Sequence, residues 1–197
     1  MGITAKQVKD LRDKTGAGMM DCKKALTETD GNIDDAVKLL REQGIAKAAS
    51  KAGRSTSEGA ISSYIHPGDK LGVLVEVACE TDFVARTQQF QQFTHDVAMH
   101  IAASAPICVE RDQVDPELVE QEREIFMTQA RNDGKPEKIL DKIVDGKIEK
   151  YYSEIVLLEQ AFVKDNDKTV DDYVKEVVGS LGENIRIKRF ARFRLGE

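Results

Sequence analysis

The first 44 residues carry apolar positions at helical spacing, interrupted twice by turn residues. We expect three short helices, over about residues 4–15, 20–28 and 33–44, the last of them ending at Gly44. Thr4 and Gln7 form a capping-box pair at the start of the first helix, and Asn32 is placed to cap the third. Three helices of this length predict a small domain with a thin core, near the lower size limit for independent folding.

A polar segment follows these helices and separates them from the rest of the chain. Residues 45–58 contain few large apolar side chains, carry three basic residues and end in Ser-Thr-Ser and a glutamate. Such a composition is typical of a helix end that runs into a linker. We therefore expect an N-terminal three-helix domain with its linker over residues 1–54, and a second domain over residues 55–197.

The second domain is predicted to contain strands and helices in an order that excludes repeated βαβ units. Two strand-like runs, 60–65 and 71–78, are separated by a Pro-Gly turn and should form a hairpin. Further helices are expected over about 88–104, 115–132, 136–152 and 169–182, and further strands over 155–163 and 185–195. The two helices between about 115 and 152 should form an antiparallel helical hairpin. The predicted class is α+β, with a small three- to four-stranded antiparallel sheet.

The final strand alternates between apolar and basic residues, which predicts one buried and one solvated face. The apolar face is expected to hold Ile185, Ile187, Ala191, Phe193 and Leu195. The opposite face would carry Arg186, Lys188, Phe190, Arg192 and Arg194. This basic face could meet an RNA backbone, with Phe190 free to stack on a base. The net charge of −6 favours a simple solvated face and argues against a general nucleic-acid binder.

Composition narrows the class of protein further. Hydrophobic residues make up 41% and charged residues 32% of the 197 residues. The longest apolar runs are strand-sized, far below the roughly 20 residues of a membrane span. The cysteines Cys22, Cys79 and Cys108 are odd in number and widely spaced, which fits a reducing cytoplasm and no disulfide framework.

Candidate catalytic and metal-binding groups are few. His66, Asp82 and Cys79 could be written as a nucleophilic triad, but a triad is defined by geometry. Cys79, at a strand end, is better explained as a small buried hydrophobe. His95 and His100 are five residues apart, which does not match the i, i+4 spacing of paired metal ligands on a helix. We therefore predict no enzymatic activity, no metal and no cofactor.

The most unusual stretch is the exit of the second strand, where Glu80-Thr81-Asp82-Phe83 places an aromatic ring directly beside carboxylates. Two arrangements fit these residues. In the first, which composition alone favours, Phe83 closes the edge of the core while Thr81 or Asp82 caps a following helix. In the second, Phe83 stands outward as a wedge for another molecule.

A second unusual stretch lies in the first domain, where Gly16-Ala17-Gly18 interrupts the helices and Met19-Met20 follows. A flexible turn with one buried methionine is the simple explanation. A small domain with a thin core also leaves at least one methionine exposed, and soft Met side chains suit the helix or groove of a partner.

These two stretches resemble the signatures of the bacterial elongation factor Ts family. The resemblance rests on Leu11–Leu26, LRDKTGAGMMDCKKAL, and on Thr81–Ala85, TDFVA, and it extends to Gly182–Ile185 and Arg192–Glu197. Members of this family exchange guanine nucleotide on the GTPase elongation factor Tu. The resemblance therefore implies a cytoplasmic translation factor with that partner, and a first domain like ubiquitin-associated (UBA-like) domains.

The resemblance also implies the candidate site residues. Those that would dock on the G domain of elongation factor Tu are Leu11, Arg12, Thr15, Gly16, Ala17, Gly18, Met19 and Met20. Those that would disturb the Mg²⁺ ion and the phosphate loop beside the nucleotide are Thr81, Asp82, Phe83, Val84 and His66. Because each motif occurs once, whereas longer members carry the core subdomain twice, we expect a homodimer. An adaptor that keeps Phe83 in its core is the alternative.

Overall fold

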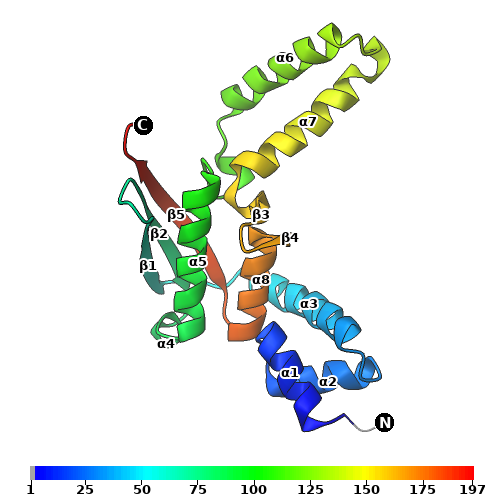
Figure 1. Ribbon diagram of the computed structural model, residues 1–197, viewed down its shortest axis with the longest axis vertical. Helices are drawn as coiled ribbons and strands as arrows, with labels where there is room; N and C mark the ends of the chain where they lie inside the picture. Colours follow the sequence, from blue (N-terminus) through cyan, green and yellow to red (C-terminus); the bar gives the residue numbers. More distant parts are fainter. Residues whose placement is uncertain (1–2) are drawn as a thin grey trace. The chain divides into compact units, whose positions relative to one another are not determined.

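The computed structural model describes residues 3–197, which form helices and two small sheets (Figure 1). The helices are α1 (Ala5–Thr15), α2 (Met19–Glu28), α3 (Ile33–Ala49), α4 (Asp82–Ala85), α5 (Gln88–Ser104), α6 (Pro116–Asn132), α7 (Leu140–Ile155) and α8 (Val170–Leu181). Short 3-10 turns are η1 (Arg111–Gln113), η2 (Glu137–Ile139) and η3 (Leu157–Glu159). The strands are β1 (Glu58–Ile65), β2 (Leu71–Cys79), β3 (Ala161–Phe162), β4 (Asp165–Thr169) and β5 (Ile185–Arg194). An antiparallel sheet has the order β1-β2-β5, and β3 pairs with β4, so the α+β class is confirmed.

These elements gather into two compact units, which are described separately. Unit 1 comprises the chain up to Ala60 together with Val77–Phe93 and Asp172–Arg186. Unit 2 comprises Ile61–Glu76, Thr94–Asp171 and Ile187–Glu197. This division does not decide the predicted boundary between residues 54 and 55, which stays a prediction. The first two residues of the predicted first domain, Met1 and Gly2, lie outside the described residues.

In unit 1, the first three helices begin where the sequence predicts them, at Ala5, Met19 and Ile33. Thr4 N–H donates to Gln7 Oε1 at 2.9 Å and Gln7 N–H donates to Thr4 Oγ1 at 3.3 Å, which completes the capping box of α1. Gly16 ends α1 in the left-handed conformation, with φ of 67°. Asn32 caps α3 through its side-chain oxygen. The three helices share a core of Val8, Leu11, Cys22, Ala25, Leu26 and Ala36.

Helix α3 is longer than predicted, because it runs through Gly44 to Ala49 instead of stopping at the glycine. A Cβ atom added at Gly179 of α8 would lie 3.0 Å from Gly44 Cα, so the two helices approach backbone to backbone. The missing side chain of Gly179 therefore serves close helix packing, and Gly44 does not end α3. An ion pair between Arg41 Nη2 and Asp172 Oδ2, at 3.0 Å, joins the same two helices.

Strands β1 and β2 form the predicted hairpin, although β1 begins at Glu58, two residues before the expected start. In the connecting turn, Gly68 and Asp69 adopt positive φ values of 97° and 55°. His66 N–H closes the turn by donating to Leu71 O at 2.9 Å. The alternation of β2 is confirmed by its fully or nearly fully buried valines, Val73, Val75 and Val77.

The predicted strand over residues 155–163 is wrong. Helix α7 extends to Ile155, a 3-10 turn follows, and only Ala161 and Phe162 are extended. Their partner is β4, which the sequence does not predict because DNDKT contains no large apolar residue and only one β-branched residue. The apolar residues that suggested a strand, Val156 and Leu157, are instead buried beside the end of α7.

Helices α6 and α7 form the predicted helical hairpin in unit 2, and Figure 1 shows them side by side and antiparallel. Asp115 caps α6 through the N–H of Glu117, with Pro116 at the first helical position, as expected. Helix α7 starts later than predicted, at Leu140, because a 3-10 turn comes between it and Pro136.

The final strand, β5, is confirmed, but its faces are not as predicted. Ile187 is buried as expected, whereas Phe193 is 68% exposed. Phe190 and Arg192, expected on the solvated face, are partly buried. The alternation therefore changes phase after Ile187, and a change of one residue moves every later side chain to the opposite face.

Most basic residues at the end of β5 are paired with carboxylates. Arg189 Nε lies 2.7 Å from Glu76 Oε2. Arg192 and Arg194 both reach Glu197, at 3.1 Å and 3.4 Å. These pairs reduce the positive charge that an RNA backbone would require, which favours a solvated sheet edge over the RNA-binding alternative.

A buried histidine joins α5 to the β3–β4 pair in unit 2. Val163 N–H donates to His100 Nδ1 at 3.2 Å, and His100 Nε2 lies 2.9 Å from Gln160 Oε1. Nδ1 therefore accepts while Nε2 carries the proton, so the ring is neutral. Burial lowers the pKa of His100 from its ordinary value of 6.5, against an opposing effect of the Gln160 hydrogen bond.

Acidification should destabilise the fold through this histidine. Because the pKa of His100 is lower in the folded than in the unfolded chain, the neutral ring stabilises the fold above about pH 6.5, and this contribution is lost as the pH falls. We expect the free energy of unfolding in urea to fall more steeply for the wild type than for His100→Gln, by up to about 1.4 kcal/mol per pH unit. Ile125→Gln, at an exposed position of α6, is the control and should keep the wild-type slope. Equal slopes for wild type and His100→Gln would contradict this account.

Candidate partner-binding site

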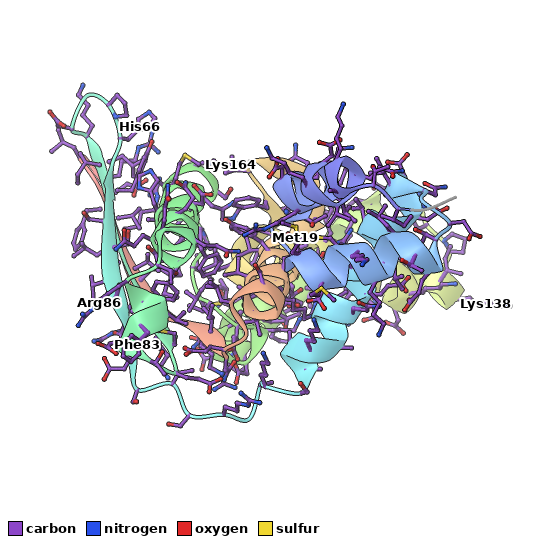
Figure 2. The ribbon with its side chains drawn as sticks, turned by 90° about the horizontal axis from the view of Figure 1, so that it is seen from below. Met19, His66, Phe83, Arg86, Lys138 and Lys164 are labelled. Atoms are coloured by element: carbon purple, nitrogen blue, oxygen red, sulfur yellow. The ribbon has the colours of Figure 1, made fainter. Side chains whose placement is uncertain are left out.

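The predicted site residues lie on two segments of unit 1 and on one turn of unit 2. Residues 81–84 follow β2 and begin α4, and residues 11–20 join α1 to α2, all within unit 1. His66 lies in the turn between β1 and β2, within unit 2. Figure 2 labels one side chain from each segment: Phe83, Met19 and His66.

Phe83 is 80% exposed, the highest value among the exposed large apolar side chains of the described residues. It lies on α4, a helix of four residues that contributes no fully buried side chain, and Figure 2 shows it there beside Arg86. The arrangement in which Phe83 closes the core is therefore wrong. The cap expected with it is present, because Thr81 Oγ1 accepts from the N–H of Val84 at 3.4 Å.

Asp82 is the first residue of α4 and forms an ion pair one turn along the helix. Its Oδ2 lies 2.9 Å from Arg86 Nη2, and both side chains are substantially exposed. An exposed pair of this kind contributes at most about 1 kcal/mol to stability. The carboxylate can therefore leave Arg86 for another partner at low cost.

The residue that fixes this loop is not evident from local sequence patterns. Glu183, in the turn after α8, accepts hydrogen bonds from the backbone N–H groups of Glu80 and Thr81, at 3.1 Å and 3.0 Å. It also accepts from the Thr81 hydroxyl at 2.6 Å. Glu183 and Thr81 are 102 residues apart in the chain, so no periodic pattern connects them. The only signal is the closing motif Gly182–Ile185, which contributes to the family resemblance.

The N-terminal segment exposes both of its methionines. Met19 is 50% and Met20 is 75% exposed at the start of α2, in agreement with the expectation that at least one is accessible. Arg12, in the last turn of α1, is exposed as well. Leu11, by contrast, is fully buried in the helical core and supports the segment from inside.

The turn between α1 and α2 is held on both sides by hydroxyl groups. The Thr15 hydroxyl donates back to the α1 backbone at 2.8 Å and accepts from the N–H of Ala17 at 3.3 Å. Ser180 of α8 donates to the carbonyl oxygen of Gly16 at 2.8 Å. Gly18 then caps α2 in an extended conformation. Helix α8 therefore supports this turn in addition to the loop held by Glu183.

His66 is exposed in the β1–β2 turn and is oriented by a neighbouring aromatic side chain. Its Nδ1 lies 3.1 Å from the hydroxyl of Tyr64, and the two ring centroids are 6.1 Å apart. Tyr64 itself makes an edge contact with His95 of α5, at 5.7 Å between centroids. The position of His66 is thus set by contacts within unit 2.

The burial and protonation of Cys79 argue against a nucleophilic triad of His66, Asp82 and Cys79. Cys79 is fully buried and its thiol donates to the carbonyl oxygen of Thr81 at 3.1 Å. Burial raises the pKa of Cys79, which keeps the thiol protonated and a poor nucleophile.

Within residues 3–197, no group of three or more side chains is placed to hold a metal ion. No helix in the described part of the chain has the length and apolar character needed to cross a membrane.

Comparison with known proteins decides the family. The family model described as "Elongation factor TS" matches residues 4–197. The chain belongs to the elongation factor Ts family. Proteins named "Elongation factor Ts" from Geobacter sulfurreducens and Geotalea daltonii are 59% and 58% identical to it, over 100% of this chain and 91% of each relative. The protein of the same name from Desulfotalea psychrophila is 58% identical over 100% of both chains.

This elongation factor Ts family membership confirms the resemblance drawn from the two motifs. It also makes the chain a translation elongation factor. The full-length match includes both candidate segments of unit 1 and the Gly182–Ile185 turn.

The approach of α3 to α8 allows a matched pair of substitutions. A Cβ at Gly179 would meet the Gly44 backbone at 3.0 Å, whereas a Cβ at Gly44 would have no atom within 4 Å. Alanine favours a helix over glycine by about 1 kcal/mol at either position, so the difference between the variants isolates the contact. We expect Gly179→Ala to be less stable than Gly44→Ala by about 1–3 kcal/mol in urea unfolding. Equal stabilities would show that the two helices do not pack this closely.

Proposed function

We propose that this chain promotes the release of GDP from the GTPase elongation factor Tu, so that GTP can rebind. The observation that carries the proposal is the exposure of Phe83 on a short helix held by polar contacts. In the elongation factor Ts family, the motif that matches Thr81–Val84 is the part that enters beside the nucleotide. An aromatic ring in water, backed by a fixed turn, suits insertion into a partner.

Thr81, Asp82, Phe83 and Val84 form the inserting edge in this proposal. A GTPase holds GDP chiefly through Mg²⁺ and through backbone amides around the phosphates. Moving that phosphate loop by about an ångström removes contacts to charged oxygens that are worth several kcal/mol. Phe83 supplies the volume that displaces the phosphate loop. Asp82 supplies a carboxylate that can leave its exposed ion pair with Arg86 and bind a group of elongation factor Tu. His66 is proposed to enter the same partner from the β1–β2 turn.

The turn between α1 and α2 is the proposed docking segment on the G domain. Met19 and Met20 present flexible apolar side chains there, which adapt to the surface of a partner helix. Arg12, Thr15, Gly16, Ala17 and Gly18 shape this surface, with Leu11 packed behind it. Docking through this segment would supply binding free energy that offsets the cost of opening the nucleotide site.

The proposed action requires no covalent chemistry. If the chain weakens GDP binding to elongation factor Tu, then GDP weakens the binding of the chain by the same factor. Exchange is therefore faster in both directions while the nucleotide equilibrium is unchanged. The chain would act in the cytoplasm as a nucleotide exchange factor and not as an enzyme.

Phe83→Ala tests the inserting edge. Because Phe83 is exposed, its removal should leave the melting temperature almost unchanged. The rate of GDP release from elongation factor Tu, followed by stopped flow with a fluorescent GDP, should fall by about 10- to 100-fold. Ile125→Ala, at an exposed position of α6, is the control and should keep the wild-type rate. An adaptor that keeps Phe83 in its core would give the opposite result: Phe83→Ala would disrupt the fold and leave the rate of GDP release unchanged.

We also propose that the chain is a homodimer that joins through the outer sheet face of unit 2, defined by Ile61, Ile65, Leu74 and Phe193. Ile61 is 71% exposed, and the other three side chains are exposed as well. A Cβ at Gly72 would lie 3.0 Å from Ile65 Cδ1, which places the β1 isoleucines and the even-numbered residues of β2 on one face. The Arg189–Glu76 pair extends this face to β5.

A second copy is the occupant we favour for the outer sheet face, because the face is continuous over three strands and flat apolar sheet surfaces pair by stacking. Four large apolar side chains from one small sheet are more than a scatter of single exposed residues. Each motif of the site occurs once in the chain, so a dimer would supply two copies of both Phe83 and His66.

Ile61→Glu tests the dimer. A carboxylate buried at an apolar interface is strongly unfavourable, so the variant should be monomeric where the wild type is dimeric, with the dissociation constant raised by at least about tenfold. Sedimentation equilibrium measures the change, and circular dichroism should show an intact fold. Ile125→Glu, exposed on α6, should remain dimeric. A monomeric wild type with full exchange activity would defeat the proposal.

A further inference from the structure

Helix α4 carries Phe83 but has little packing of its own. It contains four residues, none of them fully buried, so its orientation is not fixed by a hydrophobic core. A single helical turn is also unstable in isolation, because nucleation costs more than one hydrogen bond returns. Whatever holds Phe83 in one direction must therefore act through the residues immediately before it.

Those residues are held by the carboxylate of Glu183. Its Oε2 accepts from the backbone N–H groups of Glu80 at 3.1 Å and Thr81 at 3.0 Å, and its Oε1 accepts from the Thr81 hydroxyl at 2.6 Å. Because that hydroxyl gives its proton to Glu183, its lone pair points to the N–H of Val84, which it caps at 3.4 Å. The orientation of the α4 cap is thus set by Glu183.

The contact is reciprocal, which makes it rigid. Glu80 Oε1 accepts from the backbone N–H of Asn184 at 2.7 Å, so each segment offers a carboxylate to the backbone of the other. The buried Asn184 side chain donates to the carbonyl oxygens of Ala52, at 3.3 Å, and Arg54, at 2.8 Å. Arg54 Nη1 in turn forms an ion pair with Glu80 Oε1, at 3.5 Å. The turn after α8 therefore ties the exit of β2 to the segment that follows α3.

We propose that Glu183 is the positioning residue for Phe83 in nucleotide release. In this proposal Glu183 does not touch the partner. It holds the backbone of Glu80 and Thr81, so that the Phe83 ring projects from unit 1 in one direction. This role rests on the proposed function of the chain. Hydrogen bonds to a charged acceptor are the strong ones, and three converge here on one carboxylate. A positioning residue of this kind affects the release step more than the affinity of docking, because the docking segment lies elsewhere in unit 1.

Substitution of Glu183 should separate these two quantities. With Glu183→Ala, the maximal rate of GDP release from elongation factor Tu at saturating factor should fall by about tenfold or more, as expected when a reacting group is displaced by about an ångström. The concentration of factor at half-maximal rate should change by less than about threefold, since the docking surface is intact. Glu183→Gln keeps one oxygen that can accept both backbone N–H groups, so it should recover most of the rate. Glu124→Ala, a carboxylate on exposed α6, is the matched control.

A second pair of variants covers the case in which Glu183→Ala does not fold. Thr81→Val keeps the shape but removes the hydroxyl that links Glu183 to the α4 cap, and it should lower the maximal rate. In Thr81→Ser, which keeps the hydroxyl, the backbone hydrogen exchange of residues 80–84 should match that of the wild type. Backbone hydrogen exchange of residues 80–84 should be faster in Glu183→Ala and Thr81→Val, which measures the loss of positioning without elongation factor Tu.

The outcomes distinguish this role from the proposed function itself. A wild-type chain that leaves GDP release at its spontaneous rate would overturn the proposed function, and the positioning role with it. An active wild type with an equally active Glu183→Ala or Thr81→Val would overturn only the positioning role. A loss that appears solely as a higher half-saturating concentration would also overturn it, because it would place Glu183 in docking.

Discussion

The carboxylate of Glu183 fixes the backbone just before Phe83 through hydrogen bonds, whereas most other segments are fixed by packing in a hydrophobic core. Most side chains are fixed because burial stabilises one arrangement, by about 1.5–3 kcal/mol for a large apolar group. Phe83 forgoes that stabilisation, since it is almost fully in solvent. Its backbone must therefore be fixed by directional polar contacts, and a charged acceptor shared by two N–H groups and a hydroxyl is a strong form of such contact.

Within unit 1, the end of α8 supports both segments that we propose for partner binding. Gly179 allows α3 to pack closely, Ser180 bonds to the turn at Gly16, and Glu183 bonds to the exit of β2. These groups lie within five consecutive residues of one helix end, so the two segments share a short and well-ordered support. A shared support holds the two segments in a fixed arrangement within unit 1, which a flexible connection would not do.

The sequence predicts a helix, strand or exposed side chain correctly where the residues that determine it are close together in the chain. The Thr4 capping box, the Asp115-Pro116 start of α6 and the exposed methionines follow from neighbouring residues, and the structure contains all three. Predictions fail where the contacts are distant in the chain: α3 continues past Gly44, where it packs against Gly179 of α8. The hydrogen bonds of Glu183 are missed for the same reason, since Thr81 lies 102 residues away in the chain.

The phenylalanines show why exposure is harder to predict than secondary structure. Phe90 and Phe93 are fully buried because they belong to a helical stripe that continues through Val97 and Ile101 of α5. Phe83 precedes that stripe, on a turn too short to have a buried side. Phe193 lies beyond the phase change of β5, so strand alternation assigns it to the wrong face. An apolar residue is thus left exposed where the periodic pattern that would bury it begins too late or is interrupted. The interruption depends on contacts that only the folded chain provides.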